Sequence, residues 1–113
     1  MATGTIKGLI RQQVTLSAGS KVASLVADAY RQDELVLVTG YLQINSPLVR
    51  DDILFTMNNV YAANGSARLP FIKSNGSIFF GKTSANSNAV AVDTASAGSA
   101  NEYYTFNFMF RVS

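Results

Sequence analysis

The chain has 113 residues, and its nine Lys and Arg residues against seven Asp and Glu residues give a net charge of +2. This length suits one domain with a sizeable core, and the scattered charges exclude the clustered basic surface that nucleic-acid binding needs. The absence of Cys and His excludes disulfides, Ser-His and Cys-His nucleophile pairs and conventional zinc sites.

We expect residues 1–113 to form a single β domain, with residues 1–8 as a flexible N-terminal segment. The N-terminus lacks the charged start and apolar run of a signal peptide. No stretch approaches the roughly 18 consecutive apolar residues of a membrane span. The sequence therefore predicts a protein made in a cytoplasm, with no signal peptide and no membrane insertion.

The first half of the chain consists of short extended segments. Leu9 to Leu16 alternates in polarity and ends at Ala18-Gly19-Ser20. Val22 to Ala29 fits either a helical spacing or an irregular strand. Glu34 to Ile44 is the strongest interior strand, and Asn45-Ser46-Pro47 ends it.

Further extended segments follow. Ile53 to Met57 reads as a strand with its first, third and fifth residues in phase. Leu69 to Ile72 and Ile78 to Phe80 flank Ser74-Asn75-Gly76-Ser77, and Asn-Gly is the preferred pair for a two-residue hairpin loop. Ala89 to Asp93 is interpreted as a short edge strand between two mobile loops.

The C-terminal stretch from Tyr103 to Val112 gives the clearest signal. Because successive strand side chains point to opposite faces, its aromatic side chains at alternate positions need a sheet that packs on another layer. The inward set is Tyr104, Phe106, Phe108, Phe110 and Val112. The sequence predicts an all-β fold, a small antiparallel β-sandwich, jelly roll or barrel of about seven to eight short strands with little helix.

Apolar residues on both faces of one strand suggest self-association. Leu35 to Val38 is apolar throughout, and Met109 is the one apolar residue on the polar face of the last strand. A small monomer has difficulty covering both sides of such a strand, so a subunit contact is one explanation. A sandwich deep enough to bury both faces unaided is the other.

Catalysis is not expected. The adjacent carboxylates of Asp51-Asp52 and Asp33-Glu34 precede strands, where they would diverge as solvated turn residues. Calcium needs six or more oxygens, and glycoside hydrolysis needs two convergent carboxyl groups. The sequence therefore predicts no enzyme, no metal and no cofactor, and a carboxylate glycosidase ranks far below a binding or structural role.

The order of these pieces resembles a known family. Tyr30 to Leu42 reads as a polar turn, followed by a hydrophobic strand and then a Gly. The same order continues in four later segments, which are Leu54 to Met57, Leu69-Pro70-Phe71, Asn75 to Ile78 and Tyr104 to Asn107. This order resembles the C-terminal head domains of receptor-binding proteins from tailed phages of Gram-positive bacteria, of the lactococcal-phage type. The resemblance covers roughly residues 14 to 112.

The resemblance implies a non-catalytic homotrimer at the tail tip or baseplate of a virion. Its partners would be host cell-wall polysaccharide and other tail or baseplate proteins, and it would act in host adhesion. The alternative is a structural virion, baseplate or assembly protein that binds no saccharide. Binding of a host polysaccharide separates the two.

Candidate saccharide ligands come from loop composition, because the chain has neither the Trp nor the His that such heads often use. Amide, guanidinium and carboxylate groups suit sugar hydroxyls. The expected site is Asn58, Asn59, Tyr61, Arg68, Asp93 and Asn101. The other tyrosines, Tyr30, Tyr41, Tyr103 and Tyr104, could also be half exposed and stack on a sugar, although packing in the core is the simpler role for any single one.

Overall fold

The computed structural model describes residues 12–63 and 68–112, and the predicted flexible segment 1–8 lies outside this range. The fold is all-β, as predicted, and the described residues contain no helix. The strands are β1 Gln12–Gln13, β2 Leu16–Ala18, β3 Val22–Gln32, β4 Leu35–Ile44, β5 Leu48–Val49, β6 Ile53–Met57, β7 Arg68–Lys73, β8 Ile78–Thr83, β9 Ala89–Val92, β10 Ser96–Ala97 and β11 Tyr103–Arg111.

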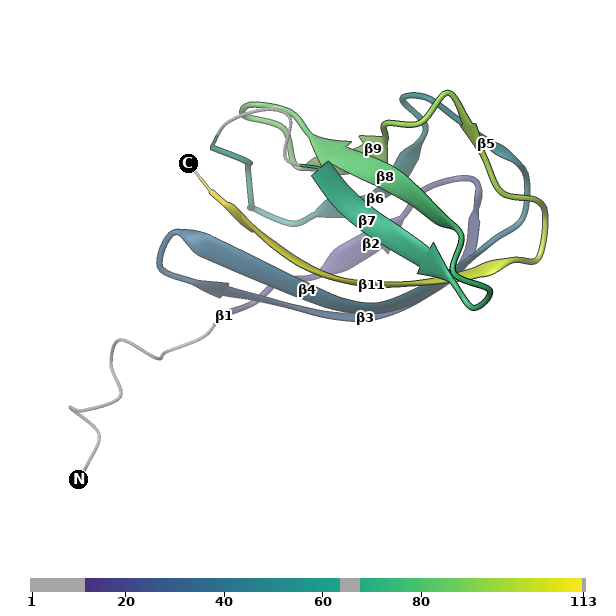
Figure 1. The fold of residues 1–113 in the computed structure, drawn as a ribbon. Helices are drawn as coiled ribbons and strands as arrows, with labels where there is room; N and C mark the ends of the chain where they lie inside the picture. The colour runs from purple at the N-terminus through teal and green to yellow at the C-terminus, as the bar shows by residue number, and fades with distance from the viewer. Residues whose placement is uncertain (1–11, 64–67, 113) are drawn as a thin grey trace.

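One antiparallel sheet holds nine of these strands in the order β1-β3-β4-β11-β7-β8-β9-β6-β2, and β5 pairs with β10 separately. The large sheet curls, so that β3, β4 and β11 form one layer and β6 to β9 turn back over it (Figure 1). The same N-terminal segment pairs with β3 through Gln12 and with β6 through Leu16. This segment therefore joins the two ends of the curled sheet.

Strand β11 lies in the middle of the sheet, between β4 and β7. Its burial alternates strictly, with Tyr104, Phe106, Phe108 and Phe110 inside. The expected inward aromatic face is thus confirmed. A nine-residue register with β4, from Tyr103 opposite Gln43 to Arg111 opposite Leu35, fixes which β4 side chains share its outer face.

Aromatic rings fill the space between the two layers. Phe71 lies at the centre, with ring centroids 4.9 Å from Phe79, 5.1 Å from Phe106 and 5.7 Å from Phe108. Phe55 stacks on Phe106 and Phe108 from the opposite layer. Aromatic contacts at these separations add to the free energy of burial, so this cluster holds the layers together.

The ambiguous segment from Val22 to Ala29 is a strand with a register shift between Val22 and Ser24, which is the irregular alternative. Strand β3 continues to Gln32, and Asp33 and Glu34 make a two-residue connection to β4. Asp33 has a φ of 54°, and positive φ at the first loop residue is typical of a type II′ hairpin. Glycine usually occupies that position, so this hairpin has no strong sequence signal.

The Asn75-Gly76 hairpin forms, but its predicted two-residue loop is wrong. Residues 74–77 connect β7 to β8, and Gly76 N donates to Lys73 O at 2.8 Å. Gly76 has a positive φ of 92°, whereas Asn75 does not. One left-handed Gly after a tight turn is the longer G1-bulge arrangement, because a type I′ turn needs positive φ at both central residues.

Two further expectations need correction. The predicted edge strand Ala89 to Asp93 is a strand, but β9 pairs on both sides, with β8 and with β6. Ile53 was expected in phase with Phe55, yet the register shifts between them and leaves Ile53 exposed. Of the predicted strand Leu9 to Leu16, residues 9–11 lie outside the described range, and the rest divides between β1 and β2.

Candidate binding face

The solvent side of β3, β4, β11 and β7, called here the outer face, gathers exposed apolar side chains. On β4, Val36 and Val38 are fully buried, whereas Leu35 and Leu37 are 38% and 41% exposed. Met109 on β11 lies directly opposite Leu37 and is 59% exposed. Residues 12–63 and 68–112 thus cover only one side of this part of β4.

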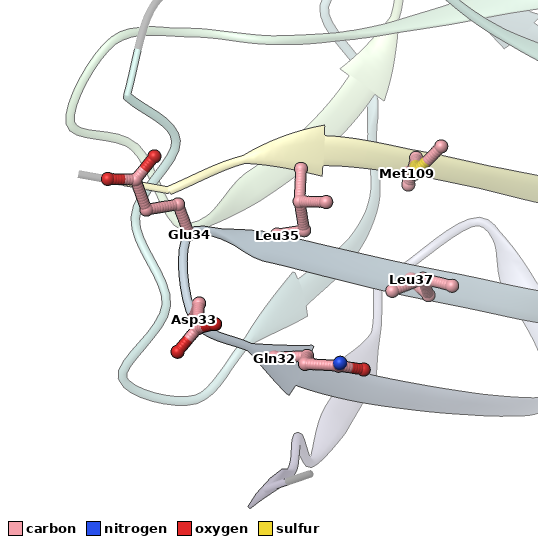
Figure 2. Close-up of a pocket in the computed structure, with 6 residues that line it drawn as sticks. All are labelled: Gln32, Asp33, Glu34, Leu35, Leu37 and Met109. Atoms are coloured by element: carbon pink, nitrogen blue, oxygen red, sulfur yellow. The ribbon is translucent and has the colours of Figure 1, made fainter. Parts of the chain in front are cut away.

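At the β3–β4 hairpin the outer face is hollowed. Figure 2 shows the six residues that line this hollow, which has a volume of about 810 Å³: Gln32, Asp33, Glu34, Leu35, Leu37 and Met109. Leu35, Leu37 and Met109 form its apolar floor, called here the apolar end. Glu34 accepts from Arg111 at 2.9 Å in an exposed ion pair at its rim.

A second hollow, of about 390 Å³, lies further along β4 and β11. It is lined by Thr39, Gly40, Tyr41, Pro70, Ile72, Thr105, Phe106 and Asn107, and is called here the tyrosine groove. Tyr41 lies opposite Thr105 on β11, and its ring centroid is 6.1 Å from that of Tyr103. Both rings are exposed, by 41% and 53%. The groove combines aromatic surface with hydroxyl and amide groups.

A third hollow, of about 280 Å³, contains two of the predicted ligands. Asn58 and Asn59 line it, together with Gln12, Gln13, Val14, Thr15, Arg31 and Val60. Asn58 N donates to Thr15 O at 3.0 Å, and Asn59 has a φ of 59°. The predicted Tyr61 follows on the same segment and is 47% exposed.

The other predicted ligands lie elsewhere. Arg68 places its guanidinium carbon 4.3 Å from the ring centroid of Phe80, and Asp93 N donates to Phe80 O at 2.8 Å. Asn101 N donates to Ile44 O at 2.7 Å, at the far end of β4. Asn58 contacts Thr15, and the neighbouring Val14 N donates to Ala29 O, which lies opposite Val38 on β4. Asn101 instead contacts Ile44, six residues further along β4. The two asparagines are therefore separated by about 20 Å along the direction of β4.

The structure therefore places the six predicted ligands in three regions. Asn58, Asn59 and Tyr61 are in one, Arg68 and Asp93 share contacts with Phe80 in the second, and Asn101 is in the third. Sugar binding at any of them stays a prediction. Sequence reasoning noted Tyr41 and Tyr103 separately, but only the register of β4 with β11 brings their rings together.

Four carboxylates, those of Glu34, Asp51, Asp52 and Glu102, are held in ion pairs. Asp52 accepts from Lys21 Nζ and from Val49 N, both at 2.8 Å, and these bonds lower the pKa of Asp52 below its ordinary value. Asp51 pairs with Lys82. Among residues 12–63 and 68–112, no group of three or more His, Cys, Asp or Glu side chains is placed to hold a metal ion.

Glu102 is the centre of a small polar cluster. It pairs with Lys73 and accepts from Ser99 N at 2.8 Å and from the Tyr104 hydroxyl at 2.9 Å. The Lys73 hydrogen bond, followed by those from Ser99 and Tyr104, lowers the pKa of Glu102. Burial, and then the bond to Glu102, raises the pKa of Tyr104 to about 12. Glu102 therefore stays ionised while Tyr104 keeps its proton, and the hydrogen bonds between them and Ser99 hold the β10–β11 connection against the sheet.

Within the described part of the chain, no helix is long and apolar enough to cross a membrane. No protein family model, curated protein or solved structure matches the chain.

Proposed function

We propose that the chain is the head domain of a receptor-binding protein of a tailed phage: a non-catalytic homotrimer that recognises host cell-surface saccharide at the tail tip or baseplate. The observation that carries the proposal is the exposed apolar surface on the outer face. Leu35, Leu37 and Met109 form a contiguous apolar patch on two inner strands of the sheet, at the β3–β4 hairpin end, and contiguous exposed apolar patches mark interaction sites.

Self-association explains the arrangement of apolar and polar side chains in this patch. The floor of the hollow is apolar, while its rim carries the Glu34–Arg111 ion pair and Asp33. An apolar centre inside a polar rim is the usual anatomy of a protein interface. The partner best suited to such a patch is another copy, because three copies can bring the same apolar surface together around a threefold axis.

The saccharide part of the proposal is supported by the remainder of the outer face. Beyond the apolar end, hydroxyl, amide and tyrosine side chains follow one another along β4 and β11. Such groups suit sugar hydroxyls and the apolar faces of sugar rings. Phage origin is supported by the order of the sequence elements alone.

A structural virion or assembly protein is the second candidate. The same apolar end favours it, since packing between subunits needs no saccharide. Under this alternative the outer face would serve assembly alone.

Two measurements on the wild-type protein test the proposal. Light scattering gives the solution mass, and pull-down with purified cell walls of Gram-positive bacteria gives saccharide binding. We expect a trimer that sediments with the walls and is released by their soluble polysaccharide. A stable oligomer that binds no cell wall from a broad panel would favour the structural alternative, and a monomer would overturn the assembly.

A further inference from the structure

We infer that the tyrosine groove is the saccharide site, and that its ligand is a neutral sugar. This inference rests on the proposed saccharide-binding function and assigns it to a place outside the predicted loop residues. The tyrosine groove has a volume of about 390 Å³, which lies within the range of small-ligand pockets.

The aromatic platform is the first support. Tyr41 lines the groove, and Tyr103 stands beside it on the adjacent strand, outside the lining itself, with the two rings tilted by 55° and their centroids 6.1 Å apart. Each ring is about half exposed, so their mutual contact leaves apolar ring surface uncovered. The C–H face of a pyranose covers such a surface, and the tyrosine hydroxyls at the ring tips remain able to bond its oxygens.

The second support is the polar lining. Asn107 lies opposite Thr39, and Thr105 lies opposite Tyr41, so one amide and two hydroxyls occupy adjacent positions on two strands. The Thr105 hydroxyl is oriented by a 3.3 Å bond to Ile72 O. The Asn107 amide offers both donors and an acceptor, the Thr39 hydroxyl offers both roles, and the Thr105 hydroxyl, whose proton goes to Ile72 O, offers acceptor lone pairs; together they match the vicinal hydroxyls of a sugar.

The charge of the lining selects the class of ligand. None of the eight lining residues is ionisable except Tyr41. A phosphate or carboxylate ligand would need cationic or multiple N–H partners, whereas a neutral sugar needs none. The groove therefore suits a neutral hexose or N-acetylhexosamine rather than an anionic polymer such as teichoic acid.

The other two hollows suit such a ligand less well. The hollow beside Asn58 is lined by amides, an arginine and a threonine but has no aromatic ring, and the apolar end lacks hydroxyl groups. The groove adjoins the apolar end, because Thr39 and Asn107 lie two residues from Leu37 and Met109. Tyr41 is four residues from Leu37 on β4, about 13 Å, so a subunit contact confined to the hairpin end leaves the tyrosines open.

The test is saturation-transfer NMR and calorimetry with galactose, glucose, rhamnose, N-acetylglucosamine and their soluble oligomers, with teichoic acid as the anionic comparison. We expect the wild-type protein to bind at least one neutral sugar. Tyr41→Ala and Tyr103→Ala should each weaken binding about tenfold, while Tyr103→Phe, which keeps the ring, stays within about threefold.

Ile53→Ala is the matched control, because Ile53 on β6 is exposed to a similar extent at 42% and lies outside the groove and outside the predicted loop site. It should leave the affinity unchanged, and all variants should keep the wild-type solution mass. Loss of binding in Tyr61→Ala, with Tyr41→Ala unaffected, would overturn the groove assignment while leaving the proposed function intact. Failure of the wild-type protein to bind any saccharide would defeat both, and binding of teichoic acid alone would refute the neutral ligand.

Discussion

Leu37 and Met109 face each other across adjacent strands on the outer face, and both are exposed among the residues that the structure describes. Their inward neighbours Val38 and Phe108 are buried beneath the same two strands. Because side chains alternate between the two faces of a strand, Leu37 and Met109 are exposed on the outer face of two inner strands. The exposed pair is where assembly of the domain is most readily tested.

Met109→Lys should break the assembly without unfolding the subunit. A lysine at a 59% exposed position changes the free energy of unfolding by no more than about 0.5 kcal/mol, but a buried interface would leave its charge unpaired. We expect light scattering to report a shift toward monomer. Ile53→Lys is the control, since Ile53 is 42% exposed on β6; an equal shift in both variants would contradict a contact centred on Met109.

The outer face also shows how far the sequence leads. Alternation in Tyr103 to Val112 correctly separates buried rings from the exposed Met109, because the pleat is a local property. The meeting of Tyr41 and Tyr103 depends on the pairing of β4 with β11, which are far apart in the chain. No local sequence pattern contains that register. The site predicted from loop composition therefore combined residues that the structure places in three separate regions.

The errors in strand position have the same cause. The short run from Ala89 to Asp93 looks like an edge strand because its flanks are polar and its length is small. In the fold, β9 pairs with β8 on one side and β6 on the other, and its Val90 and Val92 side chains are fully buried in the core. Whether a strand lies at an edge is decided by its neighbours, and those neighbours come from distant parts of the chain.

Gly40→Ala should destabilise the fold, because β4 passes close to β3 at this residue. A Cβ on Gly40 would lie 2.2 Å from Val26 O and 2.5 Å from Ala27 Cα, and both are backbone atoms. Overpacking of this kind costs about 1 to 3 kcal/mol, with the upper end expected when backbone must move. Urea unfolding followed by circular dichroism measures the loss.

Gly76→Ala provides the comparison for Gly40. Gly76 has open space around it but a φ of 92°, so the substitution carries a conformational cost of about 1 kcal/mol without a clash. The smaller loss should therefore occur at Gly76. The reverse order would show that β3 and β4 can separate locally at little cost.

Thr83→Val should stabilise the protein. Thr83 is 1% exposed, and its hydroxyl oxygen has no hydrogen-bond partner among the described residues. Valine keeps the shape and removes a buried polar group, so we expect a gain of about 1 kcal/mol in the free energy of unfolding.

Thr94→Val is the control, because the Thr94 hydroxyl accepts from Phe80 N at 3.1 Å. Its replacement should cost about 1 kcal/mol, since the backbone N–H is left without its acceptor. Thermal unfolding of the two variants should move in opposite directions. A loss in Thr83→Val would indicate that its hydroxyl is satisfied in solution.

Tyr104 should make the protein sensitive to alkali. The tyrosine ionises near pH 10.0 when exposed and near pH 12 in the fold, where burial and the neighbouring Glu102 carboxylate oppose a phenolate. Between these values the unfolded chain has lost a proton that the folded chain keeps. The contribution to stability is complete below pH 10 and falls as the pH rises toward about 12.

Tyr104→Phe removes the titrating group while keeping the ring that packs on Phe79, with its centroid 4.8 Å away. The variant loses the bond to Glu102 and should be less stable at neutral pH, yet its stability should decline less between about pH 10 and about pH 12 than that of the wild-type protein. Parallel curves for Tyr104→Phe and the wild-type protein would place the alkaline sensitivity outside this hydrogen bond.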